Sequence, residues 1–115
     1  MPKFILLPMD NPADFAGLAP EEIQGIIQRY QAWSSKLRNG GHLLDSNKLR
    51  DAEGRVVRKV DGRTVVRDGP YTETKEVVGG YWLVQARNYD EVVELVQDCP
   101  HLEFGNLVIR QIEEL

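Results

Sequence analysis

The fold prediction for this chain starts from one stretch, DGPYTETKEVVGG, which occupies residues 68–80. It combines a turn-forming Asp-Gly-Pro with three acidic side chains and Lys75, and it ends in a pair of glycines. A tight turn followed by charged side chains is a common way for a rigid scaffold to present a polar site. The segment 77–86 is rich in valine and aromatic residues, which are typical of a strand. The sequence therefore predicts a polar site next to a buried strand.

Further strands and two helices are predicted on either side of this stretch. Apolar residues on both faces indicate a strand at 3–9, and segments 42–49 and 105–112 are also expected to be strands. A helix is predicted from Pro20, with an apolar stripe at helical spacing, up to the stop signal Asn39-Gly40-Gly41. A second helix should begin after Asn88, where Glu91 completes a capping box, and should run to Pro100. The dipeptide Asp61-Gly62 predicts a peripheral β-hairpin between segments 55–60 and 63–67.

The order of these elements predicts a single α+β domain over residues 1–115. Strand, helix, strand, peripheral hairpin, strand, helix and strand form the ferredoxin-like split βαβ pattern with one inserted β-hairpin. Two helices can cover only one side of the four-stranded sheet, yet its strands carry apolar residues on both sides. A bare second face would exceed the apolar patch that a monomer usually exposes. We therefore expect a homodimer in which the sheet faces meet.

Composition and charge restrict the partners and the location. The chain has 115 residues, 42% of them hydrophobic and 28% charged, as in ordinary globular proteins. The net charge of −4 argues against nucleic acid as a partner, because phosphate contacts need a basic patch. A lone cysteine, Cys99, is typical of a reducing compartment, and the apolar start is too short for a membrane span. The expected location is cytoplasmic, without membrane contact.

The motifs resemble the YCII-related superfamily, and within it the DGPF branch. The resemblance rests on Asp68-Gly69-Pro70-Tyr71, Glu73-Thr74-Lys75-Glu76, Gly79-Gly80, Asp90-Glu91, Cys99-Pro100, Gly105 and Arg110. It covers nearly the whole chain and implies a ferredoxin-like fold that pairs into a dimeric α/β barrel. One branch of the superfamily is proposed to use a His–Asp dyad, and the corresponding positions here are Tyr30 and Cys99, so neither dyad member is retained.

The resemblance also implies two directions for function. A dehydrochlorinase belongs to the superfamily, which suggests lyase or isomerase chemistry on a small aromatic or lactone-like substrate. Members of the DGPF branch are often encoded beside extracytoplasmic-function sigma factors, which suggests a regulatory or sensing role. Most members have no established biochemical activity.

The candidate catalytic residues are Asp68, Glu73 and Tyr30. The two carboxylates are candidate bases, although Asp68 can equally be a turn residue and Glu73 a surface ion-pair partner. An ordinary phenol is a poor proton donor at neutral pH, so Tyr30 is more typical of a core aromatic whose hydroxyl finds a partner. Cys99 near a helix C-terminus is expected to be a small core residue and not a nucleophile. His101 lies near it, but the sequence indicates no acid to orient that ring.

The candidate binding residues are Lys75, Arg110, His42 and Trp33. Lys75 and Arg110 can hold a negatively charged group of a ligand, or else serve as surface ion-pair partners. Trp33 can form an aromatic wall, or else pack in the core. No spacing of histidine and cysteine resembles a zinc site, so neither a metal nor a cofactor is expected.

Three functional hypotheses follow. The first is a small-molecule-binding homodimer with a pocket between helices and sheet. The second is a metal-independent acid–base lyase or isomerase, and the third is a regulatory interaction module. A buried carboxylate with a raised pKa facing an open site would favour the enzyme. A dry interface filled by Tyr30, Trp33 and Trp82 would favour the interaction module.

Overall fold

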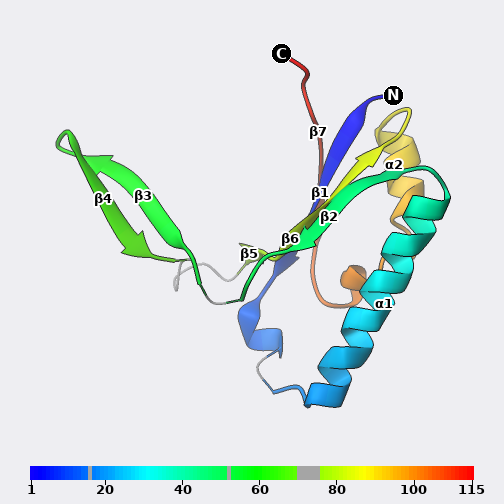
Figure 1. The fold of residues 1–115 in the computed structure, drawn as a ribbon, viewed down its shortest axis with the longest axis horizontal. Helices are drawn as coiled ribbons and strands as arrows, with labels where there is room; N and C mark the ends of the chain where they lie inside the picture. Colours follow the sequence, from blue (N-terminus) through cyan, green and yellow to red (C-terminus); the bar gives the residue numbers. More distant parts are fainter. Residues whose placement is uncertain (16, 52, 70–75) are drawn as a thin grey trace.

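A computed structural model describes residues 1–15, 17–51, 53–69 and 76–115. Its longer elements agree with the predicted order and belong to an α+β fold. In chain order they are β1 (Lys3–Asp10), η1 (Pro12–Phe15), α1 (Pro20–Asn39), β2 (Leu43–Lys48), β3 (Arg55–Val60), β4 (Arg63–Asp68), β5 (Val77–Val78), β6 (Gly80–Gln85), α2 (Tyr89–Leu95), η2 (Pro100–Glu103) and β7 (Leu107–Gln111). Figure 1 shows both α-helices on one side of the main sheet.

The main sheet is antiparallel, with β1 at its centre. β6 pairs with one edge of β1, and β7 pairs with the other. β2 lies outside β6, while the short β5 pairs with the C-terminal end of β1 through Asp10 and Val77. The long strands therefore lie in the order β7, β1, β6, β2, which is consistent with a ferredoxin-like sheet. This single-chain sheet is open and does not close into a barrel in the part of the chain that the structure describes.

The core lies between this sheet and the helices. Alternate residues of β1 and β6 point into it, because successive side chains of a strand lie on opposite faces. The core residues from the sheet are Phe4, Leu6, Trp82 and Val84, and those from the helical side are Trp33, Leu37, Val92, Val96 and Cys99. Trp33 and Trp82 meet edge to face, with ring centroids 5.1 Å apart. The two tryptophans are thus core residues of a single chain.

The opposite face of the sheet has no helix over it. Ile5, Leu7 and Leu83 lie on that face and are only half-buried, and Val108 beside Leu7 is 40% exposed. Arg110 lies on the same face, opposite Ile5 in the register of β1 and β7. We call this surface the open sheet face. The prediction that two helices leave one side of the sheet uncovered is confirmed.

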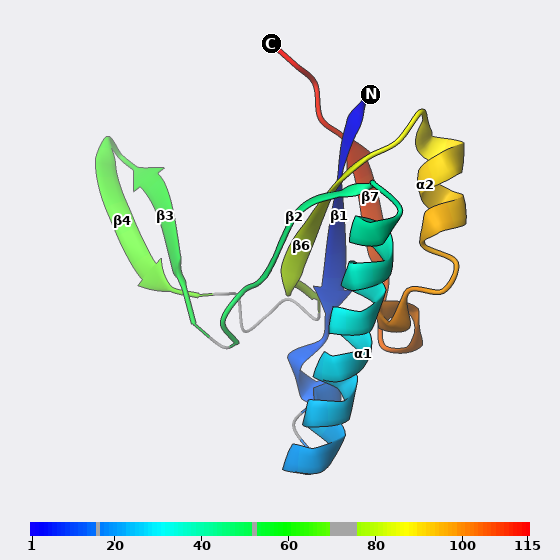
Figure 2. The same ribbon diagram turned by 45° about the vertical axis from the view of Figure 1, so that its right-hand side comes forward.

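The inserted hairpin forms a two-stranded sheet of its own, as its polar sequence predicted. β3 and β4 pair from Arg55 and Asp68 at the base to Val60 and Arg63 at the tip. Asp61 and Gly62 both have positive φ, at 49° and 78°. That combination belongs to the type I′ turn for which Asp-Gly is a preferred sequence. Figures 1 and 2 show the hairpin standing away from the body, on the side of the sheet opposite to the helices.

Two of the predicted elements are wrong in extent. The second helix ends at Leu95 and not at Pro100, and residues 96–98 form a turn. Cys99 must be extended because the residue before a proline avoids the helical region, and Pro100 then opens η2. The strand predicted over 77–86 is divided at Gly79, whose amide donates to the Pro8 carbonyl at 2.9 Å. Both departures lie at the C-terminal end of β1, where Gly79 contacts Pro8 and His101 of η2 contacts Met9.

Candidate functional site

His101 is the one buried polar or charged side chain among the described residues, and it lies in η2 with no exposed surface. Its Nε2 lies 3.1 Å from the Met9 carbonyl, which can only accept a hydrogen bond. Nε2 must therefore carry the proton of the neutral ring, which leaves Nδ1 as an acceptor. The Tyr30 hydroxyl lies 2.8 Å from Nδ1 and donates to it. The two contacts fix both the orientation and the tautomer of the imidazole.

Asp10, the last residue of β1, brings a carboxylate to the same ring. Its Oδ1 lies 3.6 Å from His101 Nδ1, and its side chain keeps 24% of its surface exposed. Burial raises the pKa of the Asp10 carboxyl above its ordinary value of 3.8, and this outweighs the opposite effect of the Lys48 charge and of His101 when its ring is protonated. Asp10 is therefore partly open to a solute, and it holds a proton more readily than a surface aspartate.

Tyr30 completes the cluster from the middle of α1. Burial, with the nearby Asp10 charge second, raises the pKa of its phenol, so the hydroxyl stays protonated at neutral pH. The ring packs on Trp82 and, edge-on, on His101, with both centroid distances 6.0 Å. The expectation that a buried Tyr30 hydroxyl finds a partner is confirmed. We call Asp10, Tyr30 and His101 the Asp10 cluster.

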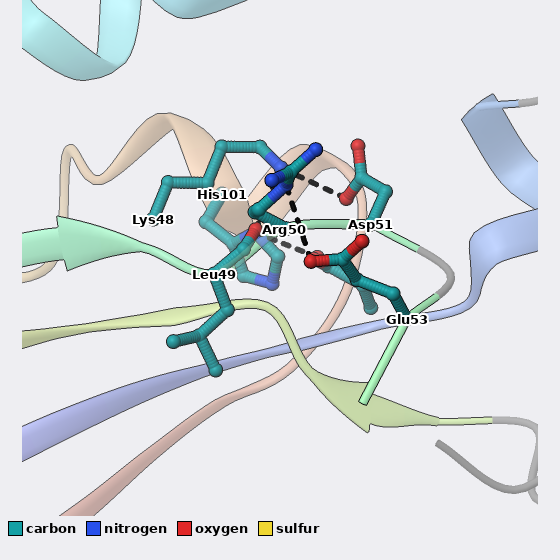
Figure 3. Close-up of polar contacts among 7 residues, drawn as sticks. Lys48, Leu49, Arg50, Asp51, Glu53 and His101 are labelled. Atoms are coloured by element: carbon teal, nitrogen blue, oxygen red, sulfur yellow. Dashed lines mark hydrogen bonds and ion pairs between the residues drawn. The ribbon is translucent and has the colours of Figure 1, made fainter. Parts of the chain in front are cut away.

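The residues at and just after the end of β2, 48–51 and 53, lie beside the Asp10 cluster. The Leu49 amide donates to the Gly79 carbonyl at 3.0 Å, which fixes this segment against the break between β5 and β6. Lys48 pairs with Asp51 at 2.8 Å, and Arg50 with Glu53 at 3.2 Å. Figure 3 shows these charged side chains gathered near His101. These residues thus supply exposed charges next to the Asp10 cluster.

Gly79 lies directly against the Asp10 carboxylate. A Cβ at this position would lie 1.8 Å from Asp10 Oδ2, well inside contact distance. The first glycine of the pair Gly79-Gly80 is therefore required here because any larger residue would collide with the Asp10 carboxylate. Its neighbour Gly80 faces the Asn47 carbonyl, which would lie 2.7 Å from an added Cβ, so this glycine permits close pairing of β6 with β2.

Two of the predicted binding residues, Trp33 and His42, lie together in a different place. They line a groove of about 580 Å³ between α1 and α2, together with Lys36, Leu37, Gly40, Glu94, Leu95, Gln97 and Asp98. Trp33 is buried and donates from Nε1 to Asp98 at 3.0 Å, and His42 Nδ1 donates to the Gln85 carbonyl at 2.9 Å. Both polar groups are thus engaged in holding the fold, with the groove on the helical side of the sheet.

The remaining predicted residues are not gathered into one site. Asp68 ends β4, pairs with Arg55 at 3.3 Å, and has a side chain that is 91% exposed. Arg110 lies on the open sheet face and is exposed. Glu73 and Lys75 lie outside the described residues. Of the predicted catalytic and binding residues that the structure describes, Tyr30 is the one placed within the Asp10 cluster.

Cys99 and the candidate metal ligands have simple descriptions. Burial raises the pKa of the Cys99 thiol to about 11, in keeping with the prediction of a core residue and not a nucleophile.

Within residues 1–15, 17–51, 53–69 and 76–115, no three side chains of His, Cys, Asp or Glu come together as a metal site. Over those same ranges, no helix has the length and apolarity to cross a bilayer.

Sequence reasoning missed Asp10 and Lys48, and it left His101 without an acid. The partner of His101 comes from the first strand, and that contact exists only because β1 and η2 meet in the folded chain. One signal was available: Asp10 places a carboxylate at the end of an apolar strand, directly before Asn11-Pro12, where a strand must stop. Polar residues at such strand ends often serve function.

We expect Asp10→Asn to make the protein more stable at neutral pH. The folded chain binds the Asp10 proton more tightly than the unfolded chain, because the folded pKa is raised above 3.8. Stability is therefore lost as pH rises from the unfolded pKa through the folded pKa, and this cost is fully present at about pH 7. The amide removes the cost, so the variant should exceed the native protein at about pH 7 and match it near pH 3. Urea unfolding of both proteins at several pH values measures this difference.

The opposite result has a definite meaning. A variant that is less stable than the native protein at neutral pH would show that attraction of the carboxylate to His101 and Lys48 outweighs its desolvation. Asp14→Asn, at an exposed position in η1, is the matched control for removal of one carboxylate from the chain.

Comparison with known proteins gives three findings. A family model for the YCII-related domain matches residues 3–115. An uncharacterized protein, R00369, from Rhizobium meliloti (strain 1021) is 38% identical over 43 residues, which are 37% of this chain and 35% of that protein. The match therefore spans about a third of the length of this curated relative.

The third finding is a similar solved structure. It is 5-chloro-2-hydroxyhydroquinone dehydrochlorinase (TftG) from Burkholderia phenoliruptrix AC1100, in complex with 2,5-dihydroxybenzoquinone. It aligns with 96% of this chain and 93% of its own, at a TM-score of 0.51 and 17% sequence identity. At that identity the likeness concerns the fold alone.

Proposed function

The chain belongs to the YCII-related family, and from this premise we propose that it binds a small molecule and transfers a proton at Asp10. The observation that carries the proposal is the Asp10 cluster itself. A partly exposed carboxylate with a raised pKa lies 3.6 Å from a fully buried, oriented imidazole. Titratable groups that perturb one another at a solvent-accessible position are typical of functional sites. This arrangement favours the acid–base hypothesis over the interaction module, because Trp33 and Trp82 are already used in the core.

Each residue of the cluster has a distinct role in the proposal. The Asp10 carboxylate removes a proton from the substrate, since it is the partly exposed carboxylate of the cluster. His101 and Tyr30 are positioning residues: the imidazole faces the carboxylate, and the phenol donates to Nδ1 and so fixes the orientation of the ring. Lys48, whose charge favours the ionised form of Asp10, can attract an anionic oxygen of the substrate.

The reaction class is an elimination or an isomerisation. In an elimination, Asp10 takes a proton, the electrons of the broken bond form a double bond, and the leaving group departs with its own electron pair. In an isomerisation, the same proton is returned at another atom. The bound 2,5-dihydroxybenzoquinone of the dehydrochlorinase suggests a small oxygenated ring as the first ligand to test. General acid–base catalysis by one positioned side chain typically contributes about 10²–10⁴ in rate.

We propose further that the working unit is a homodimer joined through the open sheet face, as the pairing of sheets in a dimeric α/β barrel requires. Support comes from the half-buried Ile5, Leu7 and Leu83 and the exposed Val108, which would otherwise form an uncovered apolar patch. Membership of the DGPF branch and a cytoplasmic location belong to this proposal as well. The lone Cys99, a buried free thiol, is compatible with that compartment.

The binding test uses 2,5-dihydroxybenzoquinone itself, titrated into the protein by calorimetry and followed by amide NMR. We expect shifted resonances at Lys48, Gly79 and His101, and weaker binding in Lys48→Gln by about tenfold, which corresponds to 1.4 kcal/mol. Lys36→Gln is the matched control because Lys36 lines the groove between the helices. Shifts confined to that groove, with weakening in the Lys36 variant only, would contradict the proposal, and so would absence of binding.

The proton-transfer test uses the same compound dissolved in D2O. The protein is expected to speed replacement of the ring hydrogens by deuterium, since a base removes them through the tautomer of the quinone. Asp10→Asn should lower that catalysed rate by at least about 100-fold. Exchange at the native rate in this variant would remove Asp10 from its assigned role.

A further inference from the structure

The β3–β4 hairpin presents apolar side chains to solvent on a part of the chain that nothing else supports. Val57 and Val66 lie directly opposite each other on one face, and they are 62% and 57% exposed. Val60 and Val65 are about two-fifths exposed on the other face. A valine pair across two strands stabilises a hairpin best when a further layer covers it. The described chain supplies no such layer over Val57 and Val66.

The radius of gyration also indicates that the hairpin is not packed against the rest of the chain. The Cα radius of gyration is 16.2 Å, whereas a compact domain of this size has a radius of about 13 Å. The difference reflects the hairpin, which projects away from the body in Figures 1 and 2. An isolated two-stranded hairpin is marginally stable in water, so this one needs a surface to pack on.

The position of the hairpin identifies a second copy of the chain as that surface. In both views the hairpin stands on the side of the sheet opposite to the helices, which is the side of the open sheet face. A protein that covers Ile5, Leu7 and Leu83 therefore also comes beside the hairpin. In a dimer with two-fold symmetry, each hairpin would in turn lie along the other subunit.

Charge favours the same occupant. Residues 55–68 hold five Arg or Lys and two Asp side chains, which gives a net charge of +3. The whole chain carries −4, which leaves −7 on the residues outside the hairpin. Attraction between a basic hairpin and an acidic body promotes association and sets its orientation. A second copy of this chain supplies such a body.

We infer that the β3–β4 hairpin is an arm that packs on the second subunit through Val57 and Val66, and that this contact holds Lys48 and Asp51 beside Asp10. Lys48 ends β2 and Arg55 begins the arm, so an arm fixed by the partner also restrains Lys48 and Asp51 beside Asp10. The inference rests on the proposed homodimer and adds to it a contact and a consequence for the site.

The decisive experiment detects contacts between subunits by isotope-filtered NMR. A mixture of protein labelled with carbon-13 at valine methyl groups and unlabelled protein reports only contacts across the interface. We expect such contacts from Val57 and Val66 in addition to those from Val108. A dimer with contacts from Val108 and none from the hairpin valines would overturn the arm and leave the sheet-face dimer standing. A monomer by sedimentation would overturn both.

A variant measures the strength of the arm. Val57→Asp combined with Val66→Asp should raise the dimer dissociation constant at least about tenfold, because two apolar contacts are replaced by buried charge. It should also weaken 2,5-dihydroxybenzoquinone binding, since Lys48 and Asp51 would no longer be held beside Asp10. Val93→Asp is the matched control, at an exposed valine of α2 on the helical side. An unchanged dissociation constant in the hairpin variant, or an equal loss in the control, would contradict the inference.

Discussion

Gly105→Ala is expected to lower the free energy of unfolding by about 3 kcal/mol, the upper part of the range for overpacking a tight site. A Cβ on Gly105 would lie 2.3 Å from the Met9 carbonyl oxygen and 3.3 Å from His101 Nε2. The obstacle is main chain, which cannot rotate away as a flexible side chain can. Met9 is also held from the other side, because its amide donates to the Asn106 carbonyl at 2.9 Å. We therefore expect the added Cβ to weaken the hydrogen bonding between the end of β1 and the start of β7.

Thermal unfolding measures this effect, and a decrease in Tm of about 10 °C is expected for a domain of this size. Gly25→Ala is the control: apart from the neighbouring backbone of its own helix, no atom lies within 4 Å of the added Cβ, and alanine is the better helix former by up to about 1 kcal/mol. The control should therefore be neutral or stabilising. A Gly105 variant that melts with the native protein would mean that β1 and the loop before β7 can separate freely.

His101→Leu is expected to destabilise the protein by about 2–4 kcal/mol, because it leaves two buried polar groups without partners. The Met9 carbonyl loses its donor, and the Tyr30 hydroxyl loses its acceptor. Leucine fills the space without supplying either bond. His101→Gln should recover about half of the loss, since its amide NH2 can replace the Nε2 donor to Met9 while the bond to Tyr30 is lost.

Urea unfolding of both variants, together with Tyr30→Phe and the double variant, measures the coupling between the two residues. The loss of stability in the double variant should be smaller than the sum of the single losses, because both changes remove the same hydrogen bond. His42→Gln is the control, since this half-buried histidine makes one described bond, to the Gln85 carbonyl. Additive losses at Tyr30 and His101 would show that their contact contributes nothing to stability.

Much of the fold could be predicted from local patterns. Pro20 at the start of α1 and Asp61-Gly62 between β3 and β4 act through neighbours in the chain, so their effects can be read without tertiary information. The length of α2 was wrong because the apolar spacing of Val92, Val96 and Cys99 continues through a turn that is also buried. The spacing of apolar residues indicates which side chains are buried. A compact turn can bury side chains at the same spacing as a helix, so the spacing alone does not show where the helix ends.

The candidate site was harder to predict, since its members come from distant parts of the chain. Tyr30 was expected to find a polar partner, but neither the partner nor its chemistry was indicated by spacing. Asp10 and His101 meet because the end of β1 passes η2, and no local rule predicts that meeting. The acids nearest in sequence to Tyr30 are Glu21 and Glu22, which are exposed in the first turn of the helix.

The central place of β1 has a consequence for how the protein is made. β1 leaves the ribosome first, but one of its edges is completed by β7, the last strand of the domain. Until then the nascent chain carries an apolar strand with open hydrogen-bonding positions, a form that invites pairing with the wrong molecule. Co-translational protection, by a chaperone or by slow emergence, therefore matters more for this topology than for one that closes from its beginning.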